Sequence, residues 1–172
     1  MIRLLKTPFG WCGIVFDADI IREIILPAPD KRKILERLRH HGSKTPNAKF
    51  RPGHHVTEVL NNLKRYFNGE KVDFNTPARY ITTLIWSSKF ERSVYKTLMA
   101  IPYGRVQSYQ WVAQKAGRPK ASRAVGNALA KNPLPIIIPC HRVIKSDGSL
   151  GGFSAIGGTT LKEKLLKLEK AL

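Results

Sequence analysis

The chain has 172 residues, 42% of them hydrophobic, and carries 30 Lys or Arg against 12 Asp or Glu, a formal net charge of +18. That length suits one domain or two small ones with a packed core. Two cysteines are too few for a disulfide scaffold, no stretch is apolar for long enough to span a membrane, and the N-terminus lacks the order of a signal peptide. We therefore expect a cytoplasmic protein, associated with the nucleoid or nucleus, and no membrane partner.

The positive charge indicates a polyanionic partner, of which nucleic acid is the commonest. A lysine-rich surface also occurs for solubility or heat tolerance, so the position of the charges matters. Between Trp86 and Ser149 there are eleven Lys or Arg and two Asp or Glu, an excess of nine positive charges. This clustering favours a nucleic acid partner over a merely soluble surface.

The first half of the chain is predicted to form strands and then two helices. Residues 1–26 are rich in β-branched and aromatic side chains, which predicts strands with a hairpin turn at 17–19. Cys12 falls within this pattern with no histidine beside it, and is expected to be a core residue. The spacing of apolar residues predicts helices over 31–39 and 56–67.

Two pairs of adjacent histidines, at 40–41 and 54–55, could suggest a metal site. Adjacent histidines are poor chelators on a regular element, and no Cys or carboxylate cluster accompanies them at ligand spacing. We therefore predict no metal. A connector over 74–85 carries the expected domain boundary, which gives an N-terminal α/β domain with its connector over residues 1–85 and a C-terminal domain over 86–172.

The second half is more clearly divided into elements. Ser88 and Glu91 have the spacing of a capping box, which predicts a helix that starts there. Ser108 is expected to cap a short helix, and a turn at Gly117–Lys120 leads into a second helix over residues 121–130. Two short helices joined by a tight, glycine-containing turn resemble a helix-turn-helix.

The second of these short helices has two contrasting faces. At about 100° per residue, the residues expected to face the core are Ala121, Ala124, Val125, Ala128 and Leu129. The opposite face carries Arg123 among Gly126, Asn127 and Ala130, so another surface could approach the backbone closely around one long cation. Arg123 is either an ordinary surface residue on an alanine-rich helix or a probe on a DNA-facing one.

A stiff apolar run precedes the second cysteine. Asn132 opens the sequence NPLPIIIPCHRV, in which three isoleucines between two prolines read as a buried extended segment. Cys140 and His141 follow at once. A thiol activated by a base attacks as the thiolate, but neighbouring side chains of an extended chain point to opposite faces. Cooperation requires a turn at this point or a bridging water; otherwise Cys140 is a small buried hydrophobe.

Glycine-rich loops follow over residues 145–158, and they are suited to closing over a flat ring. TLKE at 160–163 predicts a second capping box at the start of the last helix. The residues expected to be buried on that helix are Leu161, Leu165, Leu168 and Leu172. Glu169 lies at the margin of this stripe, where a carboxylate is either solvated or reaches a partly buried histidine.

The string PCHRV after an Ile-rich segment, with Asn132 eight positions before Cys140, resembles the active-site signature of the O6-alkylguanine-DNA alkyltransferases. The resemblance covers roughly residues 87–169. It implies two small domains, an N-terminal α/β (RNase H-like) domain and a mostly helical C-terminal domain whose helix-turn-helix binds double-stranded DNA in the minor groove. It also implies DNA repair by a single irreversible transfer from O6-alkylguanine, and from O4-alkylthymine, to Cys140. No cofactor is needed, and we expect a monomer.

The resemblance assigns roles to individual positions. The catalytic residues that it implies are Cys140, His141, Glu169, Asn132 and Tyr109. The implied DNA-binding residues are Arg123, Ser122, Gly126, Tyr109 and Ala130. The implied pocket residues are Val143, Ser154, Gly151, Lys162 and Tyr109. In this scheme Arg123 fills the gap left by an extruded base, and Glu169 orients His141.

Three other interpretations remain open at this point. A Cys/His hydrolase would also use a thiolate, but it needs an oxyanion site and usually a separated histidine. A plain helix-turn-helix DNA-binding module would need neither Cys140 nor Glu169. A non-catalytic damage sensor would lack the nucleophile, and the presence of Cys140 argues against it.

Overall fold

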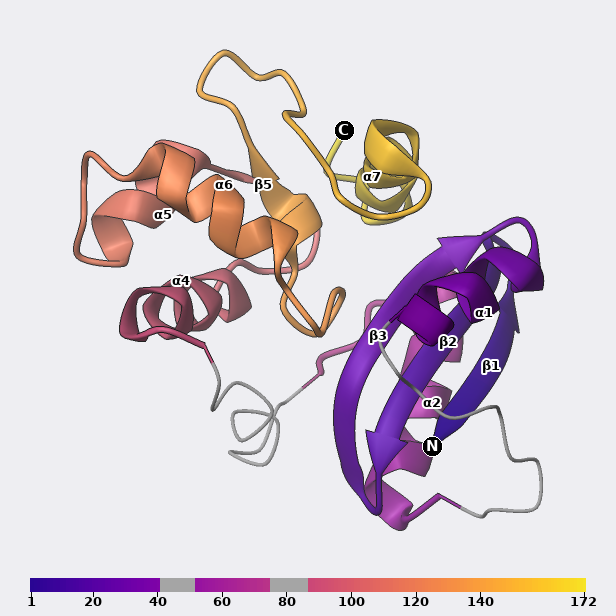
Figure 1. Cartoon of the computed structure of the whole chain (residues 1–172). Coiled ribbons are helices and arrows are strands. Elements are labelled where there is room, and N and C mark those ends of the chain that lie inside the picture. The colour runs from indigo at the N-terminus through magenta and orange to yellow at the C-terminus, as the bar shows by residue number, and fades with distance from the viewer. Residues whose placement is uncertain (41–51, 75–86) are drawn as a thin grey trace. The chain divides into compact units, whose positions relative to one another are not determined.

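A computed structural model of the chain describes residues 1–40, 52–74 and 87–172 (Figure 1). The protein is a mixed α/β chain that divides into two compact units, Met1–Thr83 and Leu84–Leu172. The predicted boundary at residue 85 lies outside the described residues, as does most of the predicted connector. No helix in the described ranges is both long and apolar enough to cross a membrane.

Unit 1 (Met1–Thr83) is built on a three-stranded antiparallel sheet. Its strands are β1 (Ile2–Thr7), β2 (Gly10–Asp17) and β3 (Ile20–Ala28), which lie side by side in chain order. The turn between β2 and β3 falls at the predicted residues. Cys12 is fully buried in β2, and burial raises the pKa of its thiol to about 12. This confirms Cys12 as a core residue and makes it a poor nucleophile.

Two helices lie on opposite faces of this sheet (Figure 1). The first, α1 (Lys31–His40), begins at the predicted residue and buries Ile34 and Leu38. It approaches β2 at Gly13, where a Cβ atom would lie only 2.6 Å from Cγ2 of Ile34. The absence of a side chain at Gly13 therefore permits close packing of helix on strand.

The second helix, α2 (His54–Phe67), begins two residues earlier than its apolar spacing predicted. The carboxylate of Asp19, in the β2–β3 turn, accepts hydrogen bonds from the backbone N–H groups of His55 (3.3 Å) and Val56 (3.0 Å). This satisfies two of the donors that a helix start leaves without intrahelical partners. Because the capping carboxylate comes from a distant turn, no local sequence pattern could reveal it.

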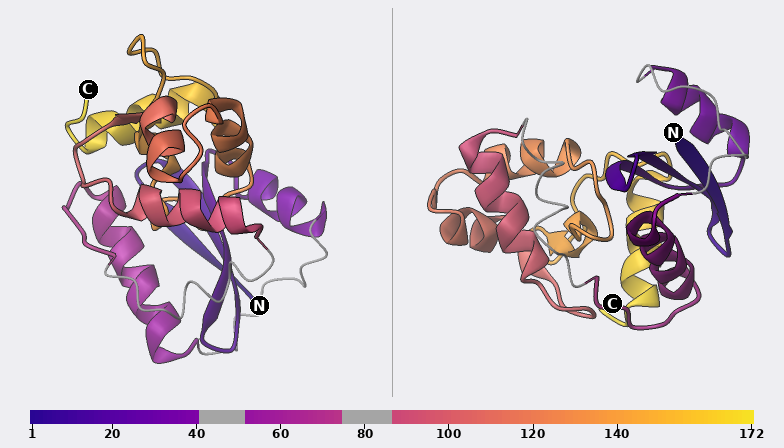
Figure 2. Two further views of the ribbon diagram at one scale, coloured as in Figure 1. Left: turned by 90° about the vertical axis from the view of Figure 1, so that its left-hand side faces the viewer. Right: turned by 90° about the horizontal axis from the view of Figure 1, so that it is seen from below.

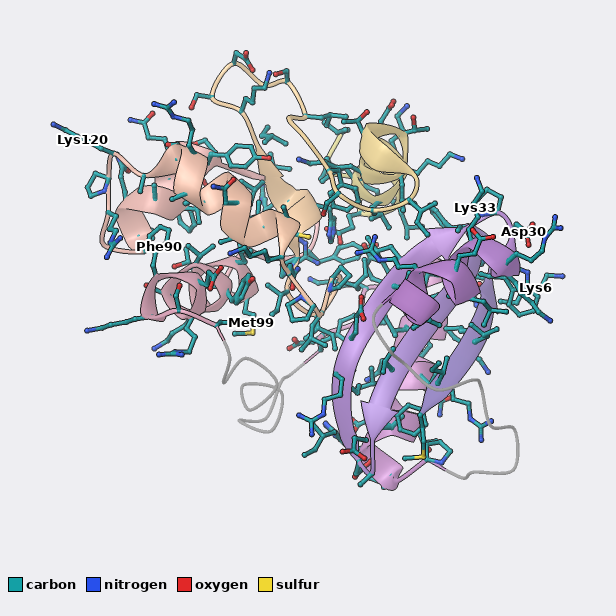
Figure 3. The ribbon with its side chains drawn as sticks, in the orientation of Figure 1. Lys6, Asp30, Lys33, Phe90, Met99 and Lys120 are labelled. Atoms are coloured by element: carbon teal, nitrogen blue, oxygen red, sulfur yellow. The ribbon has the colours of Figure 1, made fainter. Side chains whose placement is uncertain are left out.

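Unit 2 (Leu84–Leu172) contains the predicted capping box. Helix α4 (Lys89–Met99) starts where the Ser88 hydroxyl accepts from the Glu91 N–H (3.2 Å) and the Glu91 carboxylate accepts from the Ser88 N–H (2.8 Å). Figure 3 shows Phe90 pointing from α4 toward the turn that joins the next two helices. The guanidinium of Arg118, in that turn, lies 5.0 Å from the centre of the Phe90 ring, which helps to hold the turn on α4.

The two short helices form as predicted and pack on α4 and on each other (Figure 2). Ser108 caps α5 (Tyr109–Lys115) by accepting from the backbone of the first turn, and α6 (Ser122–Ala130) follows. The buried residues of α6 are Val125, Ala128 and Leu129. Ala124 is exposed, so its predicted place in the core is wrong. The core stripe of α6 is narrower than the sequence suggested.

The isoleucine run is buried, as predicted, but it is not extended. Residues 135–138 form a tight turn in which the Ile138 N–H donates to the Leu134 carbonyl (2.8 Å). Ile136 has a φ of +74°, a left-handed conformation that strains a β-branched residue. The bracketing prolines exclude regular strand pairing as well as helix, which is why the extended prediction is wrong.

The turn leads into η1 (Cys140–Arg142), a single 3-10 turn. Strand β5 (Val143–Ile144) follows and pairs in parallel with β4 (Gln107–Ser108), which immediately precedes α5. This short pair fixes the cysteine segment beside the start of α5. The backbone does turn at Cys140, which is one of the two conditions under which Cys140 and His141 could cooperate.

The last helix, α7 (Gly158–Leu168), starts two residues before the predicted capping box. That prediction is wrong, because the helix begins after Gly157, which has no side chain to cap with. The buried apolar residues of α7 are Leu161, Leu165 and Leu166. The helix ends at Leu168, which is half-buried, and Leu172 is 57% exposed, so the predicted stripe continued too far.

Candidate active site

Unit 2 contains a cavity of about 750 Å³ between α5, α6, the cysteine segment and the loop after β5. Helices α5 and α6 contribute Tyr109, Gln110, Ser122, Arg123, Gly126, Leu129 and Ala130. The cysteine segment and the loop contribute Cys140, Lys145, Ser146, Gly151, Gly152, Phe153 and Ser154. A cavity of this size with mixed apolar and polar walls is typical of a site for a small molecule or a single base.

The thiol of Cys140 lines this cavity, although the residue is only 5% exposed. Burial raises the pKa of the thiol, so it is protonated at neutral pH. A hydrogen bond from the Asn132 side chain, the charge of Lys162 and nearby backbone N–H groups act in the opposite direction. Groups that stabilise a thiolate are therefore in place around a thiol that burial keeps neutral.

His141 and Glu169 form a buried pair, in which Nε2 of His141 lies 2.8 Å from Oε1 of Glu169. Burial by itself would raise the pKa of Glu169, but hydrogen bonds from His141 and Arg142 lower it to about 2. Burial lowers the pKa of His141. At neutral pH Glu169 is thus a carboxylate and His141 a neutral imidazole, so Nε2 carries the proton and donates it, and Nδ1 carries the lone pair.

Arg142 binds the same carboxylate and anchors it to the rest of unit 2. Its Nε donates to Oε2 of Glu169 (2.8 Å), its Nη2 to Oε1 (3.0 Å), and its Nη1 to the Ile101 carbonyl (2.6 Å). The Gly104 N–H adds a donor to Oε2 (3.2 Å). Sequence reasoning missed this role of Arg142; the available signal was a cation inside an otherwise apolar signature.

Asn132 holds the turn that carries Cys140. Its Nδ2 donates to the Ile138 carbonyl (2.8 Å), and its Oδ1 accepts from the Leu134 N–H (3.0 Å). These are side-chain-to-backbone bonds, which asparagine readily forms at turns. They bridge the strained residue Ile136, so one side chain fixes both ends of the turn.

Helix α6 presents small residues and one cation to the cavity. The predicted DNA-binding residues on this wall are Ser122, Arg123, Gly126 and Ala130, and Arg123 is exposed. Tyr109 lies close to the loop opposite: a Cβ atom on Gly151 would come within 3.0 Å of its ring. Gly151 has a φ of +70°, which lets the loop pass beside Tyr109 without strain.

The predicted pocket residues do not all line the cavity. Tyr109, Gly151 and Ser154 do, and the Ser154 hydroxyl donates to the Ala130 carbonyl (3.3 Å). Val143 and Lys162 are fully buried and lie outside the lining, where the Lys162 ammonium donates to the Val143 carbonyl (2.6 Å). Their contribution to a pocket would therefore be made from behind its wall.

No group of three His, Cys, Asp or Glu side chains that could hold a metal ion occurs within residues 1–40, 52–74 and 87–172. Of the two histidine pairs considered from sequence, His41 lies outside those ranges.

Comparison with known proteins gives a consistent result. Residues 89–171 match the family model described as 6-O-methylguanine DNA methyltransferase, DNA binding domain. The methylated-DNA–protein-cysteine methyltransferase of Mycobacterium tuberculosis is 41% identical over 169 residues, 98% of this chain and 92% of the relative. The protein of the same name from Methanosarcina mazei is 39% identical over 168 residues, 98% of this chain and 96% of the relative. This chain belongs to the methylated-DNA–protein-cysteine methyltransferase family.

Solved structures of the family have the same overall fold. The crystal structure of Mycobacterium tuberculosis O6-methylguanine methyltransferase matches with a TM-score of 0.73 at 32% identity, over 99% of this chain and 92% of that one. The structure of that protein in complex with DNA matches with a TM-score of 0.72 at 30% identity, over the same shares of the two chains. Both matches span the two units of this family member.

Proposed function

We propose that this protein repairs DNA by transferring the alkyl group of O6-alkylguanine onto its own Cys140, once per molecule. Family membership supports the reaction class. The observation that carries the assignment to Cys140 is its position on the wall of the 750 Å³ cavity, next to groups that stabilise a thiolate. Cys12, by contrast, is sealed in the core of unit 1 with its pKa raised to about 12.

In this proposal α5 and α6 act as a helix-turn-helix that binds double-stranded DNA from the minor groove. The related Mycobacterium tuberculosis protein has been crystallised in complex with DNA. The small residues of α6 permit close approach to the backbone at any sequence, and the net charge of +18 favours contact with phosphates. Ser122, Gly126 and Ala130 form the contact surface, and Arg123 enters the duplex where a base has left.

Unit 1 has a three-stranded antiparallel sheet with helices on opposite faces, which supports the proposed RNase H-like assignment. The cavity draws all its residues from unit 2, which supports action as a monomer. A DNA substrate supports the proposal of a cytoplasmic protein associated with the nucleoid or nucleus.

The alkylated base is flipped into the cavity, because its O6 substituent cannot be reached inside the stacked duplex. The cysteine segment forms one wall for the ring and the Gly152–Ser154 part of the loop forms the other, with Tyr109 at the side against Gly151. The Ser154 hydroxyl faces the O6 side, while the carbonyls of Cys140 and Val143 accept from the exocyclic amine. The Val143 oxygen has a second lone pair for this bond beside the one that Lys162 occupies. We propose the same transfer from O4-alkylthymine, which keeps the contact with Ser154 but has no exocyclic amine for the two carbonyls.

The reaction is a displacement at the alkyl carbon: a carbon–sulfur bond to Cys140 forms and the bond to O6 breaks. Neutral His141 accepts the thiol proton at Nδ1 through a water molecule, and Glu169 stabilises the imidazolium that results. Tyr109 is placed beside the cavity to assist protonation of the departing guanine. Since a thioether does not return to a thiol, each molecule acts once, and no cofactor takes part.

The test is intact-mass measurement after incubation with a duplex that contains O6-methylguanine. We expect a gain of one methylene, mapped by peptide analysis to Cys140, and at most one transfer per molecule. The Cys140→Ala variant should bind the duplex with unchanged affinity and gain no mass. Turnover of several substrates per molecule would overturn the proposal, and binding without transfer by the wild type would favour the DNA-binding alternative.

A further inference from the structure

Lys162 is a buried cation of unusual placement. It lies on α7 and is 0% exposed, although lysine is almost never fully buried unless it is paired. No carboxylate in the part of the chain that the structure describes forms an ion pair with it. Burial lowers the pKa of its ammonium to about 8, so most molecules keep the charge at neutral pH despite the cost. An uncompensated charge of this kind next to a cavity indicates a functional role.

The contacts of Lys162 join the two chain segments that flank the cavity. Its Nζ donates to the carbonyl of Val143, which follows η1, and to the carbonyl of Leu150, which precedes the cavity loop. The loop next passes Gly151, against Tyr109, and the Lys162 ammonium itself lies 5.8 Å from the centre of the Tyr109 ring. One side chain therefore sets the distance between the cysteine segment, the loop and Tyr109.

The ammonium of Lys162 is also electrostatically coupled to the nucleophile. Its charge lowers the pKa of the Cys140 thiol, and the charge of a Cys140 thiolate in turn raises the pKa of Lys162. The two effects are the reciprocal sides of one attraction across a region of low dielectric. The charge of Arg142, a second buried cation of unit 2, is neutralised by the Glu169 carboxylate. Lys162 is thus the cation whose charge stays available to the thiolate.

We propose that Lys162 is a positioning residue of the transfer reaction: from behind the cavity it holds the Leu150–Ser154 loop and Tyr109 against the cysteine segment, and its positive charge stabilises the Cys140 thiolate. The role of Lys162 in alkyl transfer rests on the proposed function. The contacts and the charge coupling themselves do not depend on it.

The first experiment measures the reactivity of Cys140 toward iodoacetamide across pH, read by mass spectrometry of the Cys140 peptide. Lys162→Met keeps the length of the side chain and removes the charge. We expect its pH profile to move up by about one pH unit, with roughly tenfold slower labelling at pH 7, as for the loss of one nearby opposite charge. Lys162→Arg keeps the charge and should leave the midpoint in place. Lys164→Met, at an exposed site on the same helix, is the matched control.

A second readout is the single-turnover rate with free O6-benzylguanine, which needs the shaped cavity but no DNA. Lys162→Met should lose rate by more than the fall in thiolate explains, because the loop and Tyr109 are no longer held. An equal loss at every pH without a shift of the midpoint would overturn the proposal, since packing alone would account for it. Unchanged labelling and rate would overturn it as well.

A measurement on the wild type covers the case in which the variants do not fold. The NMR signal of the Lys162 side chain should titrate near pH 8 and should respond again at the higher pH where the Cys140 thiol ionises, and alkylation of Cys140 by iodoacetamide should remove that second response. A Lys162 signal that gives no response where Cys140 ionises, or the same response after alkylation, would overturn the proposal. If Cys140 labels with iodoacetamide as expected but never reacts with alkylguanine, the proposed function fails and the role of Lys162 beside the thiol stands.

Discussion

At the scale of single residues, the site combines groups whose charges depend on one another. Cys140 is kept neutral by burial, and Glu169 is kept ionised by its hydrogen bonds with His141 and Arg142 although it is buried. The consequence for Glu169 is that the charge of one carboxylate orients His141 and also satisfies Arg142. Removal of that charge would leave a buried guanidinium without its partner, which is costly.

This arrangement makes the free energy of unfolding depend on pH in the acidic range. The folded-state pKa of Glu169 is about 2 and its ordinary value is 4.5, so the unfolded chain binds more protons between these values. The stabilisation is present above pH 4.5 and is lost as the pH falls toward 2. Its full size is on the order of 3 kcal/mol. Urea unfolding of the wild type and of Glu169→Gln should therefore differ much more at pH 6 than at pH 3.

The matched control is Glu163→Gln, which removes an exposed carboxylate of α7 that pairs with Lys167 at 2.6 Å. Exposed pairs contribute little, so this variant should follow the wild type at both pH values. A Glu169→Gln variant that loses the same free energy of unfolding at pH 3 as at pH 6 would contradict the assignment of the acid sensitivity to Glu169.

At the scale of elements, the turn from Asn132 to Cys140 holds the nucleophile by a few local bonds. Asn132→Ala would leave the Leu134 N–H without its partner and remove one of the two donors to the Ile138 carbonyl, which also accepts from the Cys140 N–H (2.8 Å). We expect a loss of about 1–3 kcal/mol in the free energy of unfolding. The single-turnover rate with O6-benzylguanine should fall by more than the change in folded fraction, because the Cys140 thiolate loses a donor too.

Asn127→Ala provides the comparison, since Asn127 is exposed on α6 and should change neither quantity measurably. A normal rate in folded Asn132→Ala protein would mean that the turn keeps Cys140 in place without this side chain.

Local patterns predicted those elements whose determinants are local. The capping box at Ser88 and the hydroxyl cap at Ser108 need only neighbouring residues, and both occur. The start of α2 depends on Asp19 from another turn, and the backbone of the isoleucine run depends on prolines and on Asn132. The TLKE stretch at 160–163 has the same capping-box spacing as Ser88 and Glu91, but it lies inside α7. The spacing alone cannot show that a helix has already begun.

At the scale of the whole molecule, the charge of +18 should govern affinity for DNA. We expect the logarithm of the binding constant for duplex DNA to fall linearly with the logarithm of salt concentration, with a slope of about −0.9 per phosphate neutralised. Lys120 extends from the turn between α5 and α6, next to the proposed contact surface (Figure 3). Lys120→Ala should weaken binding at low salt and reduce the slope by about one.

Lys33→Ala removes the same charge from α1 of unit 1, at an exposed site. It should leave the slope unchanged if α5 and α6 make the phosphate contacts. Equal effects of the two variants would mean that DNA is bound by general positive charge rather than by the helix pair.

The residues of the site also divide into those with a local sequence pattern and those that depend on distant partners. The family resemblance named Cys140, His141 and Glu169, and its string of residues is specific. Geometry was needed to find that Arg142 joins this group and that Lys162 lies behind the cavity, because burial and partners across sequence distance leave no local pattern. The charge state of each group could not be predicted from the sequence either, because it depends on the burial and the partners of that group.

The depth of the Cys140 sulfur has a consequence for encounters with undamaged DNA. Because Cys140 is only 5% exposed, its thiol cannot reach a base that remains in the stack, however tightly the helix is bound. Binding to undamaged DNA therefore does not consume the thiol. A nucleophile that can react only once is preserved until a base leaves the stack and enters the cavity.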